Sequence, residues 1–168
     1  MNLVVSDSGP VHYLVLCEAI DVIHRLYGQL VMPAAVAQEL SHPRAPLDVQ
    51  TWMNARPKWA AVAVARQIEP FQQLGPGERE AISLALEINA TQLLVDDLAA
   101  RRIAVQRGLR IAGTVGILEA AAERGLLELP GALQKLLSTN FRVDAQVIRH
   151  ALERDLARRR TGSPRPVE

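Results

Sequence analysis

The sequence contains a single cysteine, Cys17, so an internal disulfide and a zinc site built from several thiolates are both excluded. We expect Cys17 to act as a small packed residue of the core. The sequence also lacks any run of about 20 apolar residues, the length that a membrane-spanning helix requires. These two absences favour a globular protein without a membrane span and without covalent cross-links.

The N-terminus lacks the features of a secretory signal peptide. Met1 is followed directly by a short apolar segment, without a basic start, an apolar helix and a small-residue cleavage site. We therefore expect a cytoplasmic protein. Its 168 residues are enough for one domain with a substantial core and too few for two ordinary domains.

A large excess of charge of one sign is absent as well. The 19 basic residues are balanced by 18 acidic ones, so the overall charge does not indicate nucleic-acid binding. Lys58 and Lys135 are the only lysines, and the arginines gather in residues 101–110 and 149–160. Arginine suits bidentate contacts with phosphate, although a solvated helix face is the simpler interpretation of any one of them.

Short apolar runs alternate with helical patterns along most of the chain. We expect strands at residues 3–5, 29–32, 59–64, 92–95 and 109–112, and helices at 11–19, 33–40, 47–55, 78–88, 98–107, 114–124, 133–138 and 143–160. This alternation predicts an α/β fold, a three-layer sandwich in which helices flank a central, mostly parallel sheet. Locally, Ser8 is expected as a helix N-cap and Gly108 as the glycine that follows a helix.

The domain organisation follows from these elements. Residues 1–125 are expected to form the α/β domain, and residues 126–160 a helical extension of the same domain. Residues 161–168 contain Gly, Ser and Pro and are expected to form a disordered tail.

Acidic residues follow two of the expected strands. Asp7 comes after the first strand, and Asp96 and Asp97 come after the strand at 92–95. The carboxyl ends of parallel strands meet at one rim of the sheet, so we expect these side chains to lie close together. Neighbouring carboxylates raise one another's pKa unless a cation joins them. Oxygen ligands, with only scattered histidines, favour a hard cation such as Mg²⁺ or Mn²⁺ over zinc.

Three further acids lie near helix ends. Glu39 falls in the last turn of its helix, where the helix dipole disfavours a carboxylate and some other benefit or full exposure is needed. Glu78 and Glu80 open their helix, where the dipole and free N–H groups favour acids. Helix capping is therefore an alternative to metal binding for Glu78 and Glu80. The same alternative applies to the acids that follow the strands.

Four segments, in order, resemble the successive motifs of PIN domains: residues 4–10, 31–40, 77–85 and 94–104. They contain Val-Val-Ser-Asp-Ser-Gly-Pro, a Met-Pro pair followed by Glu-Leu, Gly-Glu-Arg-Glu-Ala-Ile, and Leu-Val-Asp-Asp. Residues 108–118 and the helical end from Gly125 resemble a prokaryotic PIN subfamily related to VapC-type toxins. The similarity extends from about residue 2 to residue 158.

This resemblance implies a metal-dependent endoribonuclease, often the toxin of a toxin–antitoxin pair, with Mg²⁺ or Mn²⁺ held by three or four acids. On the family's pattern the first acid is Asp7 and the second is Glu39. The third is Glu78, with Glu80 as the alternative, and the fourth is Asp96 or Asp97. Thr114 matches a small polar position near the metal, and Ser8 is a further candidate beside the first acid.

The resemblance also implies partners and roles. Relatives commonly dimerise and are inhibited by an antitoxin that enters the acidic groove, so we expect an RNA substrate, an antitoxin and a homodimer. A carboxylate such as Glu39 or Glu78 could position the attacking water. Arg101 and Arg102 could contact flanking phosphates, with a solvated face as the alternative.

Other functions were weighed against this one. A response-regulator receiver also places acids at strand ends, but it needs a lysine after a late strand, and neither lysine lies there. A phosphate-binding loop of the GxxxxGK type is absent. The remaining alternative is a catalytically inactive PIN-like module that binds RNA or protein.

Overall fold

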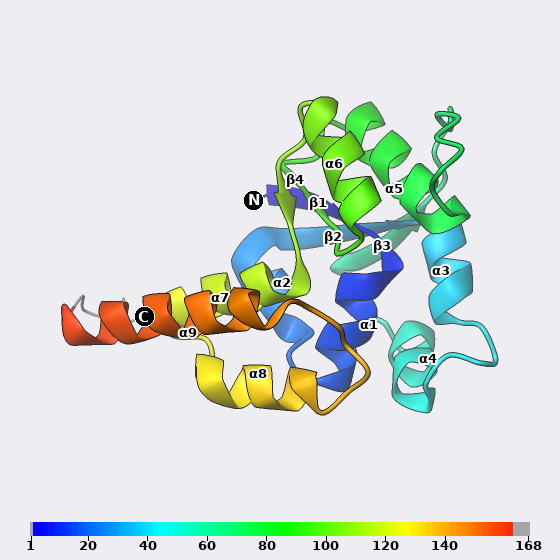
Figure 1. Ribbon diagram of the computed structural model, residues 1–168. Helices are drawn as coiled ribbons and strands as arrows, with labels where there is room; N and C mark the ends of the chain where they lie inside the picture. The colour runs from blue at the N-terminus through cyan, green and yellow to red at the C-terminus, as the bar shows by residue number, and fades with distance from the viewer. Residues whose placement is uncertain (1, 163–168) are drawn as a thin grey trace.

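The computed structural model describes residues 2–162, so the expected disordered tail lies outside the described residues from residue 163 onward. Its centre is a five-stranded sheet in the order β3-β2-β1-β4-β5, in which every pair of neighbours is parallel (Figure 1). The strands are β1 Asn2–Ser6, β2 Gly28–Pro33, β3 Ala60–Ala63, β4 Gln92–Leu94 and β5 Ile111–Ala112.

Helices cover both faces of this sheet. They are α1 Ser8–Leu16, α2 Asp21–Tyr27, α3 Ala34–Leu40, α4 Leu47–Asn54, α5 Pro76–Glu87, α6 Leu98–Gln106, α7 Thr114–Glu123, α8 Leu129–Leu137 and α9 Ala145–Arg160. In Figure 1, α5 and α6 lie above the sheet, and α1, α2 and α7 lie below it. The predicted three-layer α/β sandwich is thereby confirmed.

The sheet separates two apolar cores, as a parallel sheet buried on both faces requires. Val4 and Val5 are neighbours in β1, so their side chains point to opposite faces of the sheet. Both are fully buried, which shows that both faces are covered. Val4 packs in the core with α1, α2, α7 and α8, whereas Val5 packs in the core with α5 and α6. Cys17 is buried in the first core, in agreement with the role expected from the sequence.

Some local predictions need correction. α2 was not predicted, because Tyr27 passes directly into β2 at Gly28, whose φ of 92° makes the turn without a polar linker. Ser8 is not an N-cap: Asp7 occupies that position, and Ser8 is the first helical residue. Gly108 does follow α6 with a φ of 81°, as expected.

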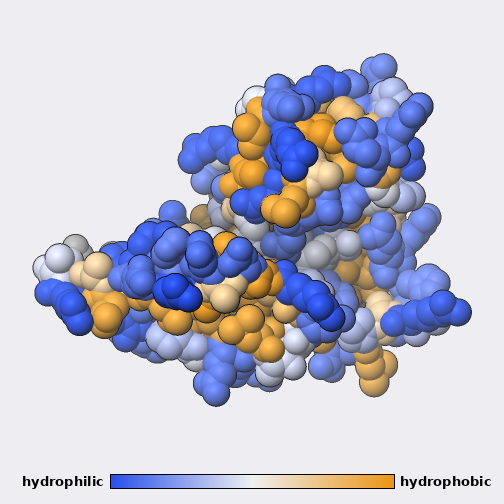
Figure 2. Space-filling view, in the orientation of Figure 1, coloured by the Kyte–Doolittle hydropathy of each residue, from blue (hydrophilic) through white to orange (hydrophobic). Residues whose placement is uncertain are grey.

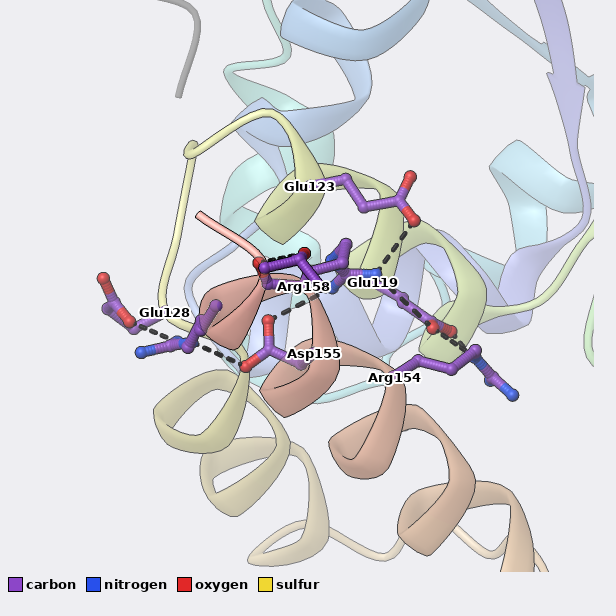
Figure 3. Close-up of polar contacts among 8 residues, drawn as sticks. Glu119, Glu123, Glu128, Arg154, Asp155 and Arg158 are labelled. Atoms are coloured by element: carbon purple, nitrogen blue, oxygen red, sulfur yellow. Dashed lines mark hydrogen bonds and ion pairs between the residues drawn. The ribbon is translucent and has the colours of Figure 1, made fainter. Parts of the chain in front are cut away.

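The chain after α7 forms a helical arm in which α9 packs against both α7 and α8. Figure 3 shows how acids tie these helices together. Asp155, which is buried, accepts hydrogen bonds from Arg158 at 3.1 Å and from Arg159 at 2.9 Å. These arginines also pair with Glu123 and Glu128, so this part of the arginine-rich segment is engaged within the protein.

We predict that Asp155→Asn lowers the free energy of unfolding by about 1–3 kcal/mol, because it weakens hydrogen bonds between charged groups at a buried position. Glu123→Gln should cost less than about 1 kcal/mol, since that pair is exposed. Urea unfolding of both variants is the measurement. Equal losses of stability would show that burial of Asp155 contributes nothing.

Within residues 2–162, no helix combines the length and the apolar character needed to cross a bilayer.

Candidate active site

Asp7 lies where the central strand β1 ends and α1 begins. Its side chain is buried, and the residue is only 6% exposed. Burial raises the pKa of this carboxyl to about 7; the Ser8 backbone N–H opposes the rise, and the carboxylates of Glu78, Glu39 and Asp96 add to it. Three acids from separate parts of the sequence therefore place their charges near Asp7 at one rim of the sheet.

Asp96 reaches this rim from β4, the neighbour of β1. Its Oδ1 accepts a hydrogen bond from the Thr114 backbone N–H at 2.7 Å, and its Oδ2 accepts one from the Thr114 hydroxyl at 2.6 Å. Thr114 is fully buried and opens α7. Desolvation raises the pKa of Asp96, whereas the Thr114 hydrogen bonds and Arg101 lower it. Thr114 thus fixes both oxygens of a half-buried carboxylate.

Asp97 has a different position from its neighbour. It is exposed and acts as the N-cap of α6, because its Oδ2 accepts a hydrogen bond from the Ala100 N–H at 2.9 Å. Of the two adjacent acids, Asp96 is the one whose charge acts on Asp7.

Glu39 lies in the last turn of α3 and is exposed to solvent. Its carboxylate rests against Gly77 in the first turn of α5, and a Cβ added at Gly77 would lie 2.6 Å from Oε1. The amino end of a helix carries partial positive charge, so this contact explains why an acid is tolerated at the unfavourable end of α3.

Glu78 and Glu80 also differ in what they contact. Glu78 Oε2 accepts a hydrogen bond from the Gly75 N–H at 2.6 Å, which caps α5. Glu80 Oε2 accepts one from the Ala35 N–H at 2.8 Å, in the first turn of α3. The charge of Glu78 raises the pKa of Asp7, and Glu80 is not among the charges that shift this pKa. The contact of Glu80 with Ala35 joins α5 to α3.

The remaining candidates surround the acids. Ser8 is half-buried, and its backbone N–H donates a hydrogen bond to the Asp7 carboxylate. The Arg101 guanidinium lies beside Asp96 and donates to the Val95 carbonyl at 3.0 Å. Arg102 is exposed on α6 and forms no ion pair within the described residues.

Sequence reasoning missed the role of the glycines at this rim. A Cβ at Gly9 would lie 3.2 Å from Asp96 Oδ2, and one at Gly113 would lie 2.9 Å from Asp96 Oδ1 and 2.6 Å from Arg101 Nη1. Gly9 and Gly77 lie in segments that resemble PIN motifs, and Gly113 lies in the segment that resembles the VapC-related subfamily, but their spatial neighbours are distant in sequence. Their shared function is to leave room for charged side chains.

The available ligand atoms suit a hard divalent cation, because all of them are oxygens. They belong to the carboxylates of Asp7, Glu39, Glu78 and Asp96 and to the hydroxyl of Thr114. Among residues 2–162, no three acid, histidine or cysteine side chains are already gathered as a cation cage. Glu78 is occupied with Gly75, and Asp96 with Thr114. Each carboxylate keeps further acceptor capacity, because it has about four lone-pair positions.

The sequence profile of the DUF3368 family, described as a PIN domain, matches residues 3–155. The chain belongs to the PIN-domain family. PIN domains are typically nucleases and usually use divalent metal ions, which agrees with an acidic rim at the strand ends.

One solved structure similar to this PIN domain is a PilT N-terminus domain protein from the hyperthermophilic archaeon Sulfolobus solfataricus P2. The two are 17% identical with a TM-score of 0.49, over 84% of this chain and 98% of the other. A comparison with curated proteins finds no significant match.

Proposed function

We propose that this PIN domain is a Mg²⁺- or Mn²⁺-dependent endoribonuclease that hydrolyses RNA phosphodiester bonds. The observation that carries the proposal is Asp7, a buried acid whose pKa is raised to about 7 with three other carboxylates contributing. Such an arrangement costs stability unless a cation compensates the charge, and acids kept at this cost are characteristic of functional sites.

Asp7, Glu78 and Asp96 would hold the cation. When bound, the cation would lower the pKa of a water and stabilise charge on the scissile phosphate. Thr114 holds the Asp96 carboxylate in place through two hydrogen bonds. Glu39 is exposed at the rim and could accept a proton from the attacking water. Arg101, beside Asp96, would contact the phosphate next to the site.

Asp97 and Glu80 take no part in this scheme. Their carboxylates accept backbone N–H groups at the starts of α6 and α3, which accounts for both side chains without a ligand.

We further propose a biological setting, on the resemblance of residues 108–118 to VapC-type toxins. In this setting the chain is the toxin of a toxin–antitoxin pair, acts in the cytoplasm, forms a homodimer and is inhibited by an antitoxin. The neighbouring open reading frame tests this directly: it should encode a small protein that binds the chain and blocks cleavage.

The alternative is a PIN-like module that binds RNA or protein without cutting it. Two observations favour the nuclease: the acids Asp7, Glu39, Glu78 and Asp96 are all retained, and the charges of the last three act on Asp7.

Incubation of the purified protein with end-labelled RNA distinguishes these functions. We expect internal cleavage in Mg²⁺ or Mn²⁺ and none in excess EDTA. RNA that stays intact at every metal concentration, or cleavage that persists in EDTA, would contradict the proposal.

We predict that Gly77→Ala slows RNA cleavage by about ten- to a hundredfold, because displacement of a catalytic group by about 1 Å is costly. An added Cβ would lie 2.6 Å from Glu39 Oε1 and would push that flexible carboxylate away. The fold should persist, since alanine is favourable in a helix. The measurement is the cleavage rate in Mn²⁺ together with the melting temperature. An unchanged rate would show that the position of Glu39 does not matter.

A further inference from the structure

A groove of about 850 Å³ begins at Asp96 and continues past the edge strand β5. It is lined by the start of α6, by β5 and α7, and by residues 141–147 of the helical arm. Figure 2 shows the surface hollowed in the corner between α6 and α9. The groove therefore touches the acidic site at Asp96 and Arg101, and the C-terminal segment forms one of its walls.

The groove carries unpaired positive charge. Its acids on α7, Glu119 and Glu123, form ion pairs with Arg154 and Arg158. Among the other arginines that line the groove, Arg101 and Arg124 donate to backbone carbonyls. Arg110 and Arg142 are exposed and form no ion pair within residues 2–162.

Asp144, which also lines the groove, is engaged as the N-cap of α9 through the Gln146 N–H at 2.8 Å. No carboxylate of the described residues lies within 4.0 Å of Arg110 or Arg142, so their guanidinium groups are available to an anionic ligand.

An aromatic ring lies beside one of these arginines. Phe141 lines the groove and packs edge-on against Tyr13 of α1, with 4.9 Å between ring centroids. The Tyr13 hydroxyl donates to Asn140 Oδ1 at 3.1 Å. Tyr13 therefore holds residues 140 and 141 against α1.

We infer that this groove binds the single-stranded stretch of RNA that leads into the acidic site. Arg110 and Arg142 contact its phosphates, and Phe141 provides a ring against which a base stacks. Cationic grooves with aromatic side chains are characteristic of single-strand binding. A volume of about 850 Å³ is that of a small-ligand pocket and admits a few nucleotides of one strand, not a duplex. That the strand is RNA rests on the proposed function.

The test is fluorescence anisotropy of the full chain with a labelled eight-nucleotide RNA, single-stranded or in a duplex, over a range of salt concentrations. All proteins carry Asp7→Asn, which removes cleavage as a complication. We expect the single strand to bind more tightly. Arg110→Ala with Arg142→Ala should weaken its binding tenfold or more and lower the slope of log affinity against log salt by about 1.4, as expected for two phosphate contacts.

Two further variants separate the contributions. Phe141→Leu keeps an apolar side chain against Tyr13 and should weaken binding about five- to a hundredfold without changing the salt slope, because stacking is not ionic. Arg56→Ala is the matched control: Arg56 is exposed after α4 and does not line the groove, so its variant should bind like the parent.

Two results would overturn the inference: no measurable RNA binding by the parent, or a double arginine variant that binds like the parent. The second result would favour a protein partner as the ligand of the groove.

The outcome is separable from the proposed function. Groove-dependent binding without cleavage by the wild type would contradict only the nuclease, whereas cleavage that is insensitive to the arginine substitutions would contradict only the groove.

Discussion

Asp7→Asn is expected to reduce metal-dependent RNA cleavage by about a thousandfold or more, because loss of several kcal/mol of charge stabilisation corresponds to several factors of ten in rate. Asparagine keeps the shape of the side chain and removes its charge. Asp7 is buried at the end of the central strand. The measurement is the single-turnover rate at saturating Mn²⁺.

Asp97→Asn is the matched control for this substitution. Asp97 precedes α6 and caps it, and asparagine caps helices about as well as aspartate. We expect the control to stay within about threefold of the wild-type rate. If Asp97→Asn were as damaging as Asp7→Asn, or if Asp7→Asn remained active, the assignment of roles within the rim would be wrong.

The same Asp7→Asn substitution is expected to stabilise the metal-free protein at pH 8 by about 4 kcal/mol. The pKa of Asp7 is about 7 in the folded protein, against an ordinary value of 3.8 that applies to the unfolded chain. Between these values the folded state binds more protons than the unfolded state, so wild-type stability falls as pH rises. Below about pH 4 both states are protonated, and the advantage of asparagine disappears.

Urea unfolding in EDTA at pH 4 and pH 8 measures this effect, provided that both proteins remain folded at the lower pH. Added Mn²⁺ at pH 8 should stabilise the wild type, since a ligand that binds only the folded state does so, and should have little effect on Asp7→Asn. Equal stability of the two proteins at pH 8 without metal would contradict the raised pKa.

The fold was largely predictable because two simple periodicities alternate along the chain. Buried runs such as Gln92–Leu94 are too short for helices, and patterns such as that of Pro76–Glu87 have a clear apolar face. The helix Asp21–Tyr27 was not predicted, because its apolar residues continue into β2 without a polar break. Its existence depends on packing and on a turn at Gly28, neither of which a local pattern contains.

The candidate site was predictable only as a set of acids. Asp96 and Asp97 are adjacent, and what distinguishes them is a partner elsewhere: Thr114 for one and the start of α6 for the other. Glu78 and Glu80 differ in the same way. Composition and spacing do not encode these contacts, which depend on how the helices pack.

Arginine illustrates the same limit. The group at 149–160 was a candidate for phosphate contacts, yet Arg154 and Arg158 pair with acids of α7, and Arg159 pairs with Glu128. Arg142 belongs to neither sequence cluster, and it lies exposed in the groove.

Calorimetric titration of Mn²⁺ into wild-type, Asp7→Asn, Asp96→Asn and Asp97→Asn proteins tests the central claim most directly, namely that acids from separate elements share one cation. The account predicts binding to the wild type and to Asp97→Asn, with release of a proton near pH 7 because Asp7 must ionise. It predicts strongly reduced binding to Asp7→Asn and Asp96→Asn. The same affinity in all four proteins, or no binding to the wild type, would contradict it.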